Sequence, residues 1–308
     1  MEWLAASPAA QRVLELAQKV AATSTTVLIT GESGTGKDQL ARWIHECSPR
    51  RDAAFLKIDC GSLPAELVES ELFGHEKGAF TGAVARKLGR LEMARGGTIV
   101  LDEVAALAPA IQSKLLRVLE ERSFERLGGR ETLHMDARLM ALTNADLRKL
   151  VAAGRFREDL YFRLNVVTIH IPPLRERPQD ILALAAHFLG RLAPVHGRAG
   201  AKLEEAAAHA LNAYAWPGNV RELKNAMERA LVFGKAKQIT VADLPDSIRA
   251  QSPDGRRSAA GVRSLEEMER EAIHAALEAT RYKISRTAEL LGINRKTLLE
   301  KRKKYGLD

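Results

Sequence analysis

The stretch Val27-Leu28-Ile29-Thr30-Gly31-Glu32-Ser33-Gly34-Thr35-Gly36-Lys37 decides the fold of this chain. Its first four residues are apolar or β-branched and predict a buried strand, while residues 39–44 continue as a helix. The glycines allow backbone N–H groups to point inward around phosphates, and the dipole of the following helix and the charge of Lys37 attract the same anion. The stretch therefore predicts a strand, a phosphate-binding loop (the P-loop, residues 31–37) and a helix.

Four further apolar runs, rich in β-branched residues, predict strands like the one before the P-loop. Segments with helical spacing separate them, such as the apolar positions 111, 115, 118 and 119. Regular alternation of strands and helices implies a parallel sheet covered on both faces. The predicted fold class is therefore α/β, with a five-stranded parallel sheet. The predicted strands span residues 26–30, 55–58, 98–101, 139–143 and 166–171.

The remainder of the chain divides into smaller parts. Pro172 and Pro173 end the last strand, and residues 180–249 have a helical pattern throughout. Pro, Asp, Gly and Ser between Gln251 and Gly261 are typical of a flexible linker, and a capping box at Ser264 opens a new helix. The predicted parts are an α/β subdomain (1–172), an all-helical lid (173–250), the linker (251–263) and a small all-helical domain (264–308).

Composition and charge narrow the class of protein. Of the 308 residues, 46% are hydrophobic, and no apolar run reaches the roughly 18 residues of a membrane span. No signal peptide opens the sequence, so a cytoplasmic location is expected. Nine basic and two acidic residues between 281 and 304 account for seven of the eight net positive charges. This tail predicts a nucleic-acid contact at the C-terminal end, with a solvated helix end as the alternative.

Acidic and polar residues follow two of the predicted strands. Asp102 and Glu103 come after the strand at 98–101, where Asp102 would hold Mg²⁺ and Glu103 would polarise the attacking water as general base. Asp38 replaces the Ser or Thr that usually ligates Mg²⁺ after the P-loop lysine, which shifts metal binding toward Asp102. Asn144 ends the fourth strand, where it would sense the γ-phosphate and orient the water. The alternative for Asp102 and Glu103 is a pair of solvated carboxylates at a strand end.

A loop between the P-loop and the acidic pair carries the string Gly78-Ala79-Phe80-Thr81-Gly82-Ala83. This string resembles the loop by which bacterial enhancer-binding proteins engage the sigma-54 factor of RNA polymerase. The segments Glu-Leu-Phe-Gly-His at 71–75 and Pro-Leu-Arg-Glu-Arg at 173–177 are similar to the same family. Residues from about 7 to 249 thus resemble the AAA+ P-loop ATPase domain of a sigma-54-dependent activator.

The resemblance implies a function for this domain. It implies ATP and Mg²⁺ as cofactors, a homo-oligomeric ring expected to be a hexamer, and sigma-54 RNA polymerase holoenzyme as the partner. In such a ring, ATP hydrolysis converts the closed promoter complex into the open complex. Gly78 and Gly82 give the loop tip conformational freedom, and an exposed Phe80 is costly unless it meets a partner. The alternative is that Phe80 folds back onto its own domain.

The same resemblance assigns roles to individual residues. Arg157 and Arg163 match arginine fingers that reach the phosphates of a neighbouring subunit. The alternative is a surface ion pair, Arg157 with Glu158 or Arg163 with Asp159. Asp59 stands where the family has an Asn that restrains the catalytic Glu, and two facing carboxylates there would couple their titration or be bridged by a cation. Arg221 matches the lid arginine that contacts nucleotide. The expected nucleotide-binding residues are Gly31, Glu32, Ser33, Gly34, Thr35, Gly36, Lys37, Asp38 and Arg221.

Residues 287–298 predict a helix-turn-helix. Ala288 is small enough for close helix packing, Gly292 can adopt the left-handed turn, and Asn294 caps the second helix. The unit resembles the DNA-binding end of the factor-for-inversion-stimulation type, which implies double-stranded enhancer DNA as partner and action as dimers. The apolar face over 265–277 either pairs the dimer or forms the domain core. The expected DNA-binding residues are Arg286, Asn294, Arg295, Lys296, Thr297, Lys301 and Arg302.

The sequence is compatible with three functions. The first is a transcription activator that couples ATP hydrolysis to opening of sigma-54 promoter complexes. The second is a DNA-bound AAA+ ATPase with another client, such as a helicase loader or remodeller. The third is a binding-only regulator in which Asp38 and Asp59 have abolished turnover. Dependence of transcription on sigma-54 separates the first two, and steady-state ATPase activity separates the third.

Overall fold

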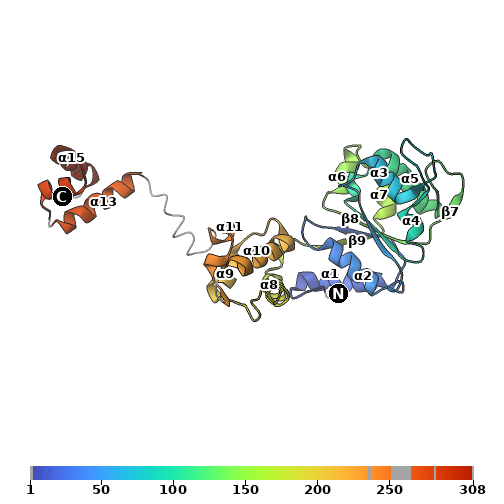
Figure 1. The fold of residues 1–308 in the computed structure, drawn as a ribbon, viewed down its shortest axis with the longest axis horizontal. Helices are drawn as coiled ribbons and strands as arrows, with labels where there is room; N and C mark the ends of the chain where they lie inside the picture. The colour runs from blue at the N-terminus through green and yellow to red at the C-terminus, as the bar shows by residue number, and fades with distance from the viewer. Residues whose placement is uncertain (1–2, 235–236, 251–264, 281, 307–308) are drawn as a thin grey trace. The chain divides into compact units, whose positions relative to one another are not determined.

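The computed structural model describes residues 3–234, 237–250, 265–280 and 282–306 of the chain. Contacts between residues divide the chain into two compact units, Met1–Ile248 and Arg249–Asp308, which Figure 1 draws as ribbons. The first unit contains the P-loop and the second contains the helix-turn-helix segment. The predicted linker at 251–263 and the capping residue Ser264 lie outside the described residues.

A five-stranded parallel sheet with the order β2-β5-β8-β1-β9 forms the centre of the first unit. The predicted fold class is confirmed, and each strand begins and ends within one residue of its predicted bounds. The order brings the carboxyl ends of β1, β5 and β8 to one edge, where ligands bind in open parallel sheets. The strands are β1 (Val27–Thr30), β2 (Phe55–Asp59), β5 (Thr98–Asp102), β8 (Arg138–Thr143) and β9 (Val167–His170).

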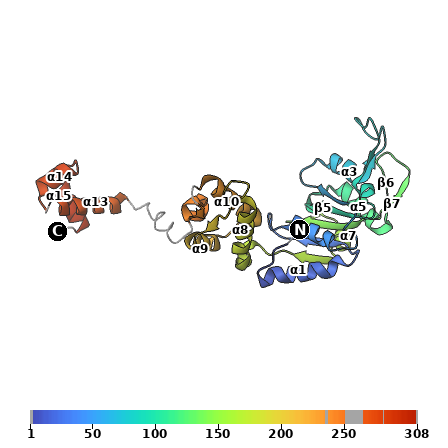
Figure 2. The same ribbon diagram turned by 60° about the horizontal axis from the view of Figure 1, so that its bottom comes forward.

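Helices cover both faces of the sheet, as Figures 1 and 2 show. Side chains alternate along each strand, so Val27 and Ile29 pack with the helices on one face while Leu28 packs with those on the other. The first face is covered by α1 (Pro8–Ala21) and α2 (Lys37–Glu46). The second face is covered by helices that include α3 (Ala65–Phe73), α5 (Pro109–Glu121) and α7 (Glu158–Leu164). Shorter helices complete this subdomain: α4 (Arg90–Met93), η1 (Val104–Ala106) and α6 (Leu147–Ala152).

Two short hairpins extend from the sheet subdomain, and the sequence did not predict their strands. The antiparallel pairs are β3 (Gly74–His75) with β4 (Lys87–Leu88), and β6 (Ser123–Glu125) with β7 (Thr132–His134). A bridge between His75 and Leu127 joins the two hairpins. The string Gly78–Ala83 therefore lies in the loop of the first hairpin, beside the second.

The lid is helical, as predicted, with one additional pair of two-residue strands. Its apolar centre includes Trp216, which is fully buried and donates its indole N–H to the Leu211 carbonyl at 2.8 Å. Trp216 and Asn219 both have a positive φ, so the Trp-Pro-Gly-Asn turn sharply separates two lid helices. The elements are η2 (Leu174–Glu176), α8 (Pro178–Leu192), β10 (Lys202–Leu203), α9 (Glu205–Ala213), α10 (Asn219–Phe233), β11 (Gln238–Ile239), η3 (Val241–Asp243) and α11 (Asp246–Arg249).

Over residues 265–280 and 282–306, the second unit contains three helices, α13 (Leu265–Ala279), α14 (Ile284–Leu290) and α15 (Arg295–Tyr305). Ile273 and Leu277 of α13 are buried against Ala288 and Leu298, so this part of the predicted apolar face belongs to the core of the unit itself. Over the described residues, no helix combines the length and the apolar character that a membrane crossing requires.

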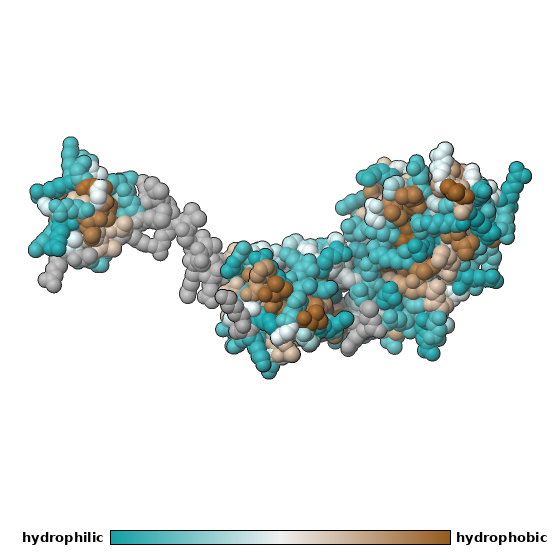
Figure 3. Space-filling model, viewed as in Figure 1, coloured by the Kyte–Doolittle hydropathy of each residue, from teal (hydrophilic) through white to brown (hydrophobic). Residues whose placement is uncertain are grey.

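Apolar side chains also remain at the surface of the first unit (Figure 3). They lie on the P-loop subdomain as well as on the lid. The most exposed large apolar residues of this unit are Val84, Phe162, Val166, Val195, Val232 and Phe233.

Candidate functional site

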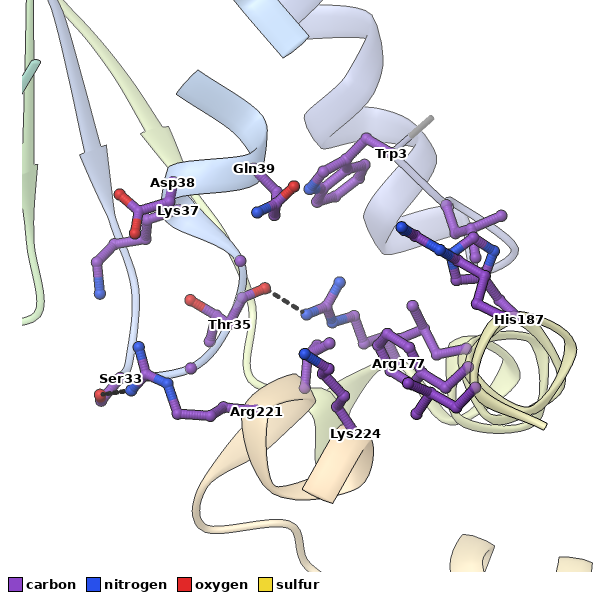
Figure 4. A pocket seen from close by; sticks show the side chains of 18 of the residues that line it. Trp3, Ser33, Thr35, Lys37, Asp38, Gln39, Arg177, His187, Arg221 and Lys224 are labelled. Atoms are coloured by element: carbon purple, nitrogen blue, oxygen red, sulfur yellow. Dashed lines mark hydrogen bonds between the residues drawn. The ribbon is translucent and has the colours of Figure 1, made fainter. Parts of the chain in front are cut away.

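A cavity of about 620 Å³ lies where the P-loop, the end of β5 and the lid meet. Figure 4 shows P-loop side chains on one side of it and lid side chains, including Arg221 and Lys224, on the other. One end is polar, with Lys37, Asp102 and Glu103, and suits phosphates. Apolar side chains that suit a flat ring also line the cavity, among basic residues such as Arg177 and His187. These apolar residues are Trp3, Leu4, Leu184, Phe188, Leu192 and Val220.

Glycine is required at several positions of the P-loop. Gly31, Gly34 and Gly36 all have a positive φ, which L side chains rarely adopt. A Cβ on Gly34 would lie 2.3 Å from the Gly218 carbonyl oxygen, because the lid approaches the loop closely there. The Lys37 ammonium donates to the carbonyls of Gly31 at 2.8 Å and Glu32 at 3.2 Å. Burial lowers the pKa of Lys37, while the nearby charges of Glu103, Asp102 and Asp38 oppose that shift.

The predicted hydrolytic residues gather at the carboxyl ends of β5 and β8. Glu103 has a left-handed backbone (φ 50°), and its N–H donates to the Asp102 carboxylate at 3.0 Å. The Glu103 carboxylate accepts a hydrogen bond from the Asn144 backbone N–H at 3.3 Å. The structure thus brings Lys37, Asp102, Glu103 and Asn144 to one site. Strain at Glu103, a non-glycine residue with positive φ, is typical of functional positions.

Asp59 does not form a direct pair with Glu103. Its carboxylate accepts hydrogen bonds from the backbone N–H groups of Gly61 at 2.9 Å and Ser62 at 3.1 Å. A Cβ on Gly61 would lie 3.6 Å from the Asp59 carboxylate and 3.5 Å from Glu103 Cβ, so Gly61 lies beside both acids. The short Gly-Ser turn after β2 therefore takes up the charge of Asp59 through backbone amides.

A cation does bridge two carboxylates in this site, but it is a side chain that the sequence analysis missed. The Lys57 ammonium lies 2.7 Å from both Asp38 carboxylate oxygens and 2.7 Å from the Asp102 carboxylate. Burial tends to lower the pKa of Lys57, but hydrogen bonds to Asp102 and Asp38 outweigh it and the pKa is raised. Lys57 could have been identified only from the pairing of β2 with β5, and the sequence of either strand alone does not reveal that pairing.

The lid contacts the P-loop through hydrogen bonds at the start of α10. The Gly34 carbonyl accepts from the backbone N–H groups of Val220 at 2.9 Å and Arg221 at 3.3 Å. The Arg221 guanidinium also donates to the Ser33 hydroxyl at 3.1 Å. The buried Asn219 donates to the Ser33 carbonyl at 3.0 Å and accepts from the Leu174 N–H at 2.8 Å. These hydrogen bonds join the P-loop directly to the lid.

A further ion pair joins Glu32 of the P-loop to the lid. Arg175 donates to the two Glu32 carboxylate oxygens at 2.9 and 2.6 Å, and Asn219 donates to one of them at 3.2 Å. Hydrogen bonding by Arg175, and then by Asn219, lowers the pKa of Glu32 from 4.5 to about 2. The carboxylate is therefore held in its charged form in the folded protein.

The lowered pKa of Glu32 gives a pH prediction with a defined sign. The stabilisation by this carboxylate is present above its unfolded pKa of 4.5 and is lost as the pH falls toward 2. We expect Glu32→Gln to lower the thermal unfolding midpoint at pH 6, with a difference from wild type that shrinks steadily below pH 4.5. Unfolding of both proteins should be followed between pH 6 and 3, with exposed Glu15→Gln as control. A difference that stays constant with pH would contradict the assignment.

The two predicted arginine fingers lie outside the cavity of their own chain. Arg157 donates to the Asp159 carboxylate at 3.0 and 2.7 Å and to the Ser113 hydroxyl at 3.1 Å. Arg163 donates to the Leu119 carbonyl at 3.1 Å. Neither residue is among those that line the cavity. Arg157 therefore does form a surface ion pair, but with Asp159 and not with Glu158, the partner considered in the sequence analysis.

The loop Gly78–Ala83 forms a compact turn at the tip of the first hairpin. The Gly78 N–H donates to the Ala83 carbonyl at 2.9 Å, and the Ala83 N–H donates to the Phe80 carbonyl at 3.0 Å. Phe80 is 44% exposed, yet its ring also contacts the buried His75 ring edge-on, with centroids 5.0 Å apart. The Phe80 ring is therefore accessible to a partner, as predicted, and it also packs on its own domain, which was the alternative.

A buried arginine on the second hairpin holds the base of this loop. Arg126, with a side chain 2% exposed, donates to the carboxylates of Glu76 at 2.9 Å, Glu92 at 2.8 Å and Glu131 at 2.8 Å. Hydrogen bonding to Glu92 raises the pKa of Arg126, so it stays charged. Since Glu76 lies two residues before Gly78, Arg126 fixes the start of the loop. The sequence analysis missed this residue because Glu76 and Glu92 are far from it in the chain.

Removal of the Arg126 charge should destabilise the two hairpins. Arg126→Met leaves several carboxylates close together without their shared donor, and we expect a loss of about 1–3 kcal/mol in the free energy of unfolding. Limited proteolysis should also cleave the loop near Lys77 faster. The exposed Arg130 on the same hairpin supplies the control variant Arg130→Met. Equal behaviour of the two variants in thermal unfolding and proteolysis would refute the anchoring role.

In the second unit, the predicted DNA-binding residues lie on and before α15. Asn294 caps this helix, since its carboxamide oxygen accepts from the Thr297 N–H at 2.8 Å and from the Thr297 hydroxyl at 2.9 Å. Arg295 and Lys296 are exposed at the start of the helix. Lys301 forms an ion pair with Glu269 of α13, so a phosphate contact by Lys301 would compete with that pair. Arg286 is exposed on α14.

Known families match three consecutive parts of the chain. The Sigma-54 interaction domain matches residues 3–170, the AAA+ ATPase lid domain matches 175–261, and the bacterial regulatory protein, Fis family, matches 264–305. The Regulatory protein AtoC of Escherichia coli (strain K12) is 44% identical over 309 residues, covering 98% of this chain and 67% of that protein. The alginate biosynthesis transcriptional regulatory protein AlgB of Pseudomonas aeruginosa is 47% identical over 301 residues, covering 98% and 67%.

The similarity extends to solved structures. A crystal structure of NtrX from Brucella abortus in complex with ADP has a TM-score of 0.74 and 36% identity, covering 99% of this chain and 69% of that one. NtrX in complex with ATP gives the same TM-score at 35% identity, with the same coverage. The chain therefore belongs to the sigma-54-dependent transcriptional activators, with an AAA+ sigma-54 interaction domain and lid followed by a Fis-family helix-turn-helix.

Proposed function

We propose that this activator binds ATP with Mg²⁺ in the cavity between P-loop and lid, and hydrolyses it at the interfaces of a homo-oligomeric ring, a hexamer by analogy with its family. Hydrolysis would move the loop Gly78–Ala83 against sigma-54 RNA polymerase and convert the closed promoter complex into the open complex. The observation that carries the proposal is the meeting of Lys37, Asp102 and Glu103 at the polar end of one cavity. The complexes of NtrX with ADP and ATP support the choice of nucleotide.

The donor chemistry of the site fits Mg²⁺. Asp102 offers a carboxylate at the cavity, and Asp38 offers another beside it. Among the described residues, no group of three or more His, Cys, Asp or Glu side chains could hold a metal by itself. This agrees with the habit of Mg²⁺ to bind one or two carboxylates together with substrate phosphates. Asp102 would be its ligand, and the ion would neutralise charge on the phosphates.

Each remaining residue of the site has a proposed role that follows from its position. Lys37 would exchange its present carbonyl partners for the β- and γ-phosphates. Glu103 would accept the proton of the attacking water, and Asn144 would orient that water. Asp59 would influence Glu103 only through the Gly61 turn that lies beside both. Arg221, from the lid, would contact the nucleotide as well as Ser33.

The second unit would bind double-stranded enhancer DNA. Arg295, Lys296 and Thr297 would face base edges from the start of α15, and Arg286 and Arg302 would contact phosphates. Two copies would act together on one site as a dimer, which matches the symmetry of most such operators. Since DNA and RNA polymerase are the proposed partners, the cytoplasm is the proposed compartment. The proposed domain limits are 1–172, 173–250 and 264–308, joined by 251–263.

An assay of promoter opening tests the proposed function. Purified protein with ATP should melt a sigma-54 promoter, and Thr81→Ala should lose promoter melting while it keeps its ATPase activity. Thr81 lies in the exposed loop and away from the cavity, so a local change there leaves the nucleotide site intact. Hydrolysis without any opening of sigma-54 complexes would assign the motor to another client. No hydrolysis at high protein concentration would leave a binding-only regulator.

A further inference from the structure

Lys57 occupies an unusual place for a lysine in this site. It extends from β2, one of the two edge strands of the sheet, and its ammonium lies 2.7 Å from Asp102 of β5 and 2.7 Å from Asp38 at the start of α2. Asp102 is the proposed metal ligand and is only 16% exposed, whereas Asp38 is 45% exposed. A single positive charge thus serves two carboxylates that differ in their access to solvent.

Among the described residues, Lys57 is the one ammonium that contacts both Asp38 and Asp102, so the two carboxylates share a single ion-pair partner. If Asp102 accepted a metal ion, the ammonium at the same carboxylate would repel that ion, because two cations would share one ligand. Lys57 has a second partner within the same distance, so it can give up Asp102 and remain paired with Asp38. The flexible Lys57 side chain needs only to break its contact with Asp102, and the backbone of β2 need not shift.

We propose that Lys57 is a positioning residue that occupies Asp102 until a metal-bound nucleotide enters, and that Asp38 is the resting partner which takes the ammonium when Asp102 is needed. This inference rests on the proposed nucleotide site and deepens it. It gives Asp38, which replaces the usual hydroxyl after Lys37, a function that does not require it to ligate metal. Lys57 also lowers the affinity of the site for metal, because the ion must compete with it for Asp102.

Binding of Mn²⁺ tests the competition without any turnover. The protein is saturated with ADP, and free Mn²⁺ is measured by electron paramagnetic resonance. Lys57→Met keeps the length of the side chain and removes its charge, so we expect roughly tenfold tighter Mn²⁺ binding. Lys224→Met removes a positive charge from the lid side of the same cavity. Because the Lys224 ammonium belongs to the lid and does not pair with Asp102, we expect less than a third of that effect, about threefold at most.

The Asp38→Asn variant separates a resting partner from a metal ligand. In the wild-type background it leaves Lys57 with Asp102 alone, so we expect Mn²⁺ affinity to fall about three- to tenfold. In the Lys57→Met background the same change should alter affinity by less than about twofold, because no ammonium needs a second partner. The two effects are therefore non-additive if Lys57 acts through Asp38.

The outcomes divide clearly. Equal effects of Asp38→Asn in both backgrounds would mean that Asp38 binds the metal or acts only through its charge, and either overturns the proposal. Unchanged Mn²⁺ affinity in Lys57→Met, or an equal gain in Lys224→Met, would overturn it as well. ADP binding in EDTA is measured first with each variant. If wild-type protein failed to bind ADP there, the proposed nucleotide site itself would fall, and the competition at Asp102 with it.

Discussion

Replacement of Glu103 by Gln should slow steady-state ATP hydrolysis by about 10²–10⁴-fold, the usual contribution of a positioned general base. Gln keeps the size of the side chain and can still accept the hydrogen bond from the Asn144 N–H, but it cannot take a proton from water. Since the Lys37 ammonium and the P-loop amides are untouched, ADP and ATP should bind with nearly unchanged affinity. Hydrolysis by phosphate release and binding by calorimetry measure the two effects separately.

Two comparisons make this result specific. Glu158→Gln removes an exposed carboxylate at the start of α7, outside the cavity, and should leave hydrolysis unchanged. Asp102→Asn should weaken Mg²⁺ binding, so that its loss of hydrolysis is partly recovered at high metal concentration. Glu103→Gln should show no such recovery. If Glu103→Gln hydrolysed ATP at the wild-type rate, the base would lie elsewhere and the proposed chemistry of the site would be wrong.

The core of this site could be predicted because its signals are local in the sequence. The run Val27–Thr30 followed by three glycines and a lysine specifies strand, loop and helix through short-range preferences alone. The same holds for Asp102 and Glu103, which follow directly after a β-branched run. Once the sheet is known to be parallel, these strand ends must share an edge, and the structure places them there.

The contacts that were missed depend on which segments become neighbours. Lys57 meets Asp102 only because β2 pairs in parallel with β5, in a register that sets Asp59 opposite Asp102. Arg126 meets Glu76 because two hairpins lie side by side, and it meets Glu92 because the helix α4 follows the first hairpin directly. Neither hairpin has strands long enough to show a period of two. Single-sequence patterns contain no information on such long-range pairings.

Asp59 illustrates how a correct position can still mislead about a contact. The family resemblance predicted that the Asp59 carboxylate faces Glu103, and therefore that the two acids titrate as a coupled pair. In the structure the Gly61 and Ser62 amides satisfy that carboxylate, since a tight turn follows β2 at once. Backbone donors two and three residues away are closer partners for an Asp than a side chain on another strand.

Arg157→Ala should reduce ATP hydrolysis about 10³–10⁵-fold, the range for an arginine finger, even though Arg157 lies outside the cavity of its own chain. In the isolated chain Arg157 is paired with Asp159 at the surface, at the start of α7, and its side chain is 46% exposed. A surface ion pair of this kind contributes little to stability, so its loss alone cannot explain a large loss of rate. A neighbouring subunit is therefore the expected source of the effect.

Mixing two inactive variants tests whether the arginine acts between subunits. Arg157→Ala subunits keep Glu103, and Glu103→Gln subunits keep Arg157, so an interface that combines the intact half of each is complete. With equal amounts and random assembly, about a quarter of the interfaces in a closed ring should recover activity. Sedimentation must show that both variants assemble like the wild type. Recovery on mixing would locate Arg157 at the phosphates of the next subunit, whereas no recovery in fully assembled mixed rings would mean that Arg157 acts only within its own chain.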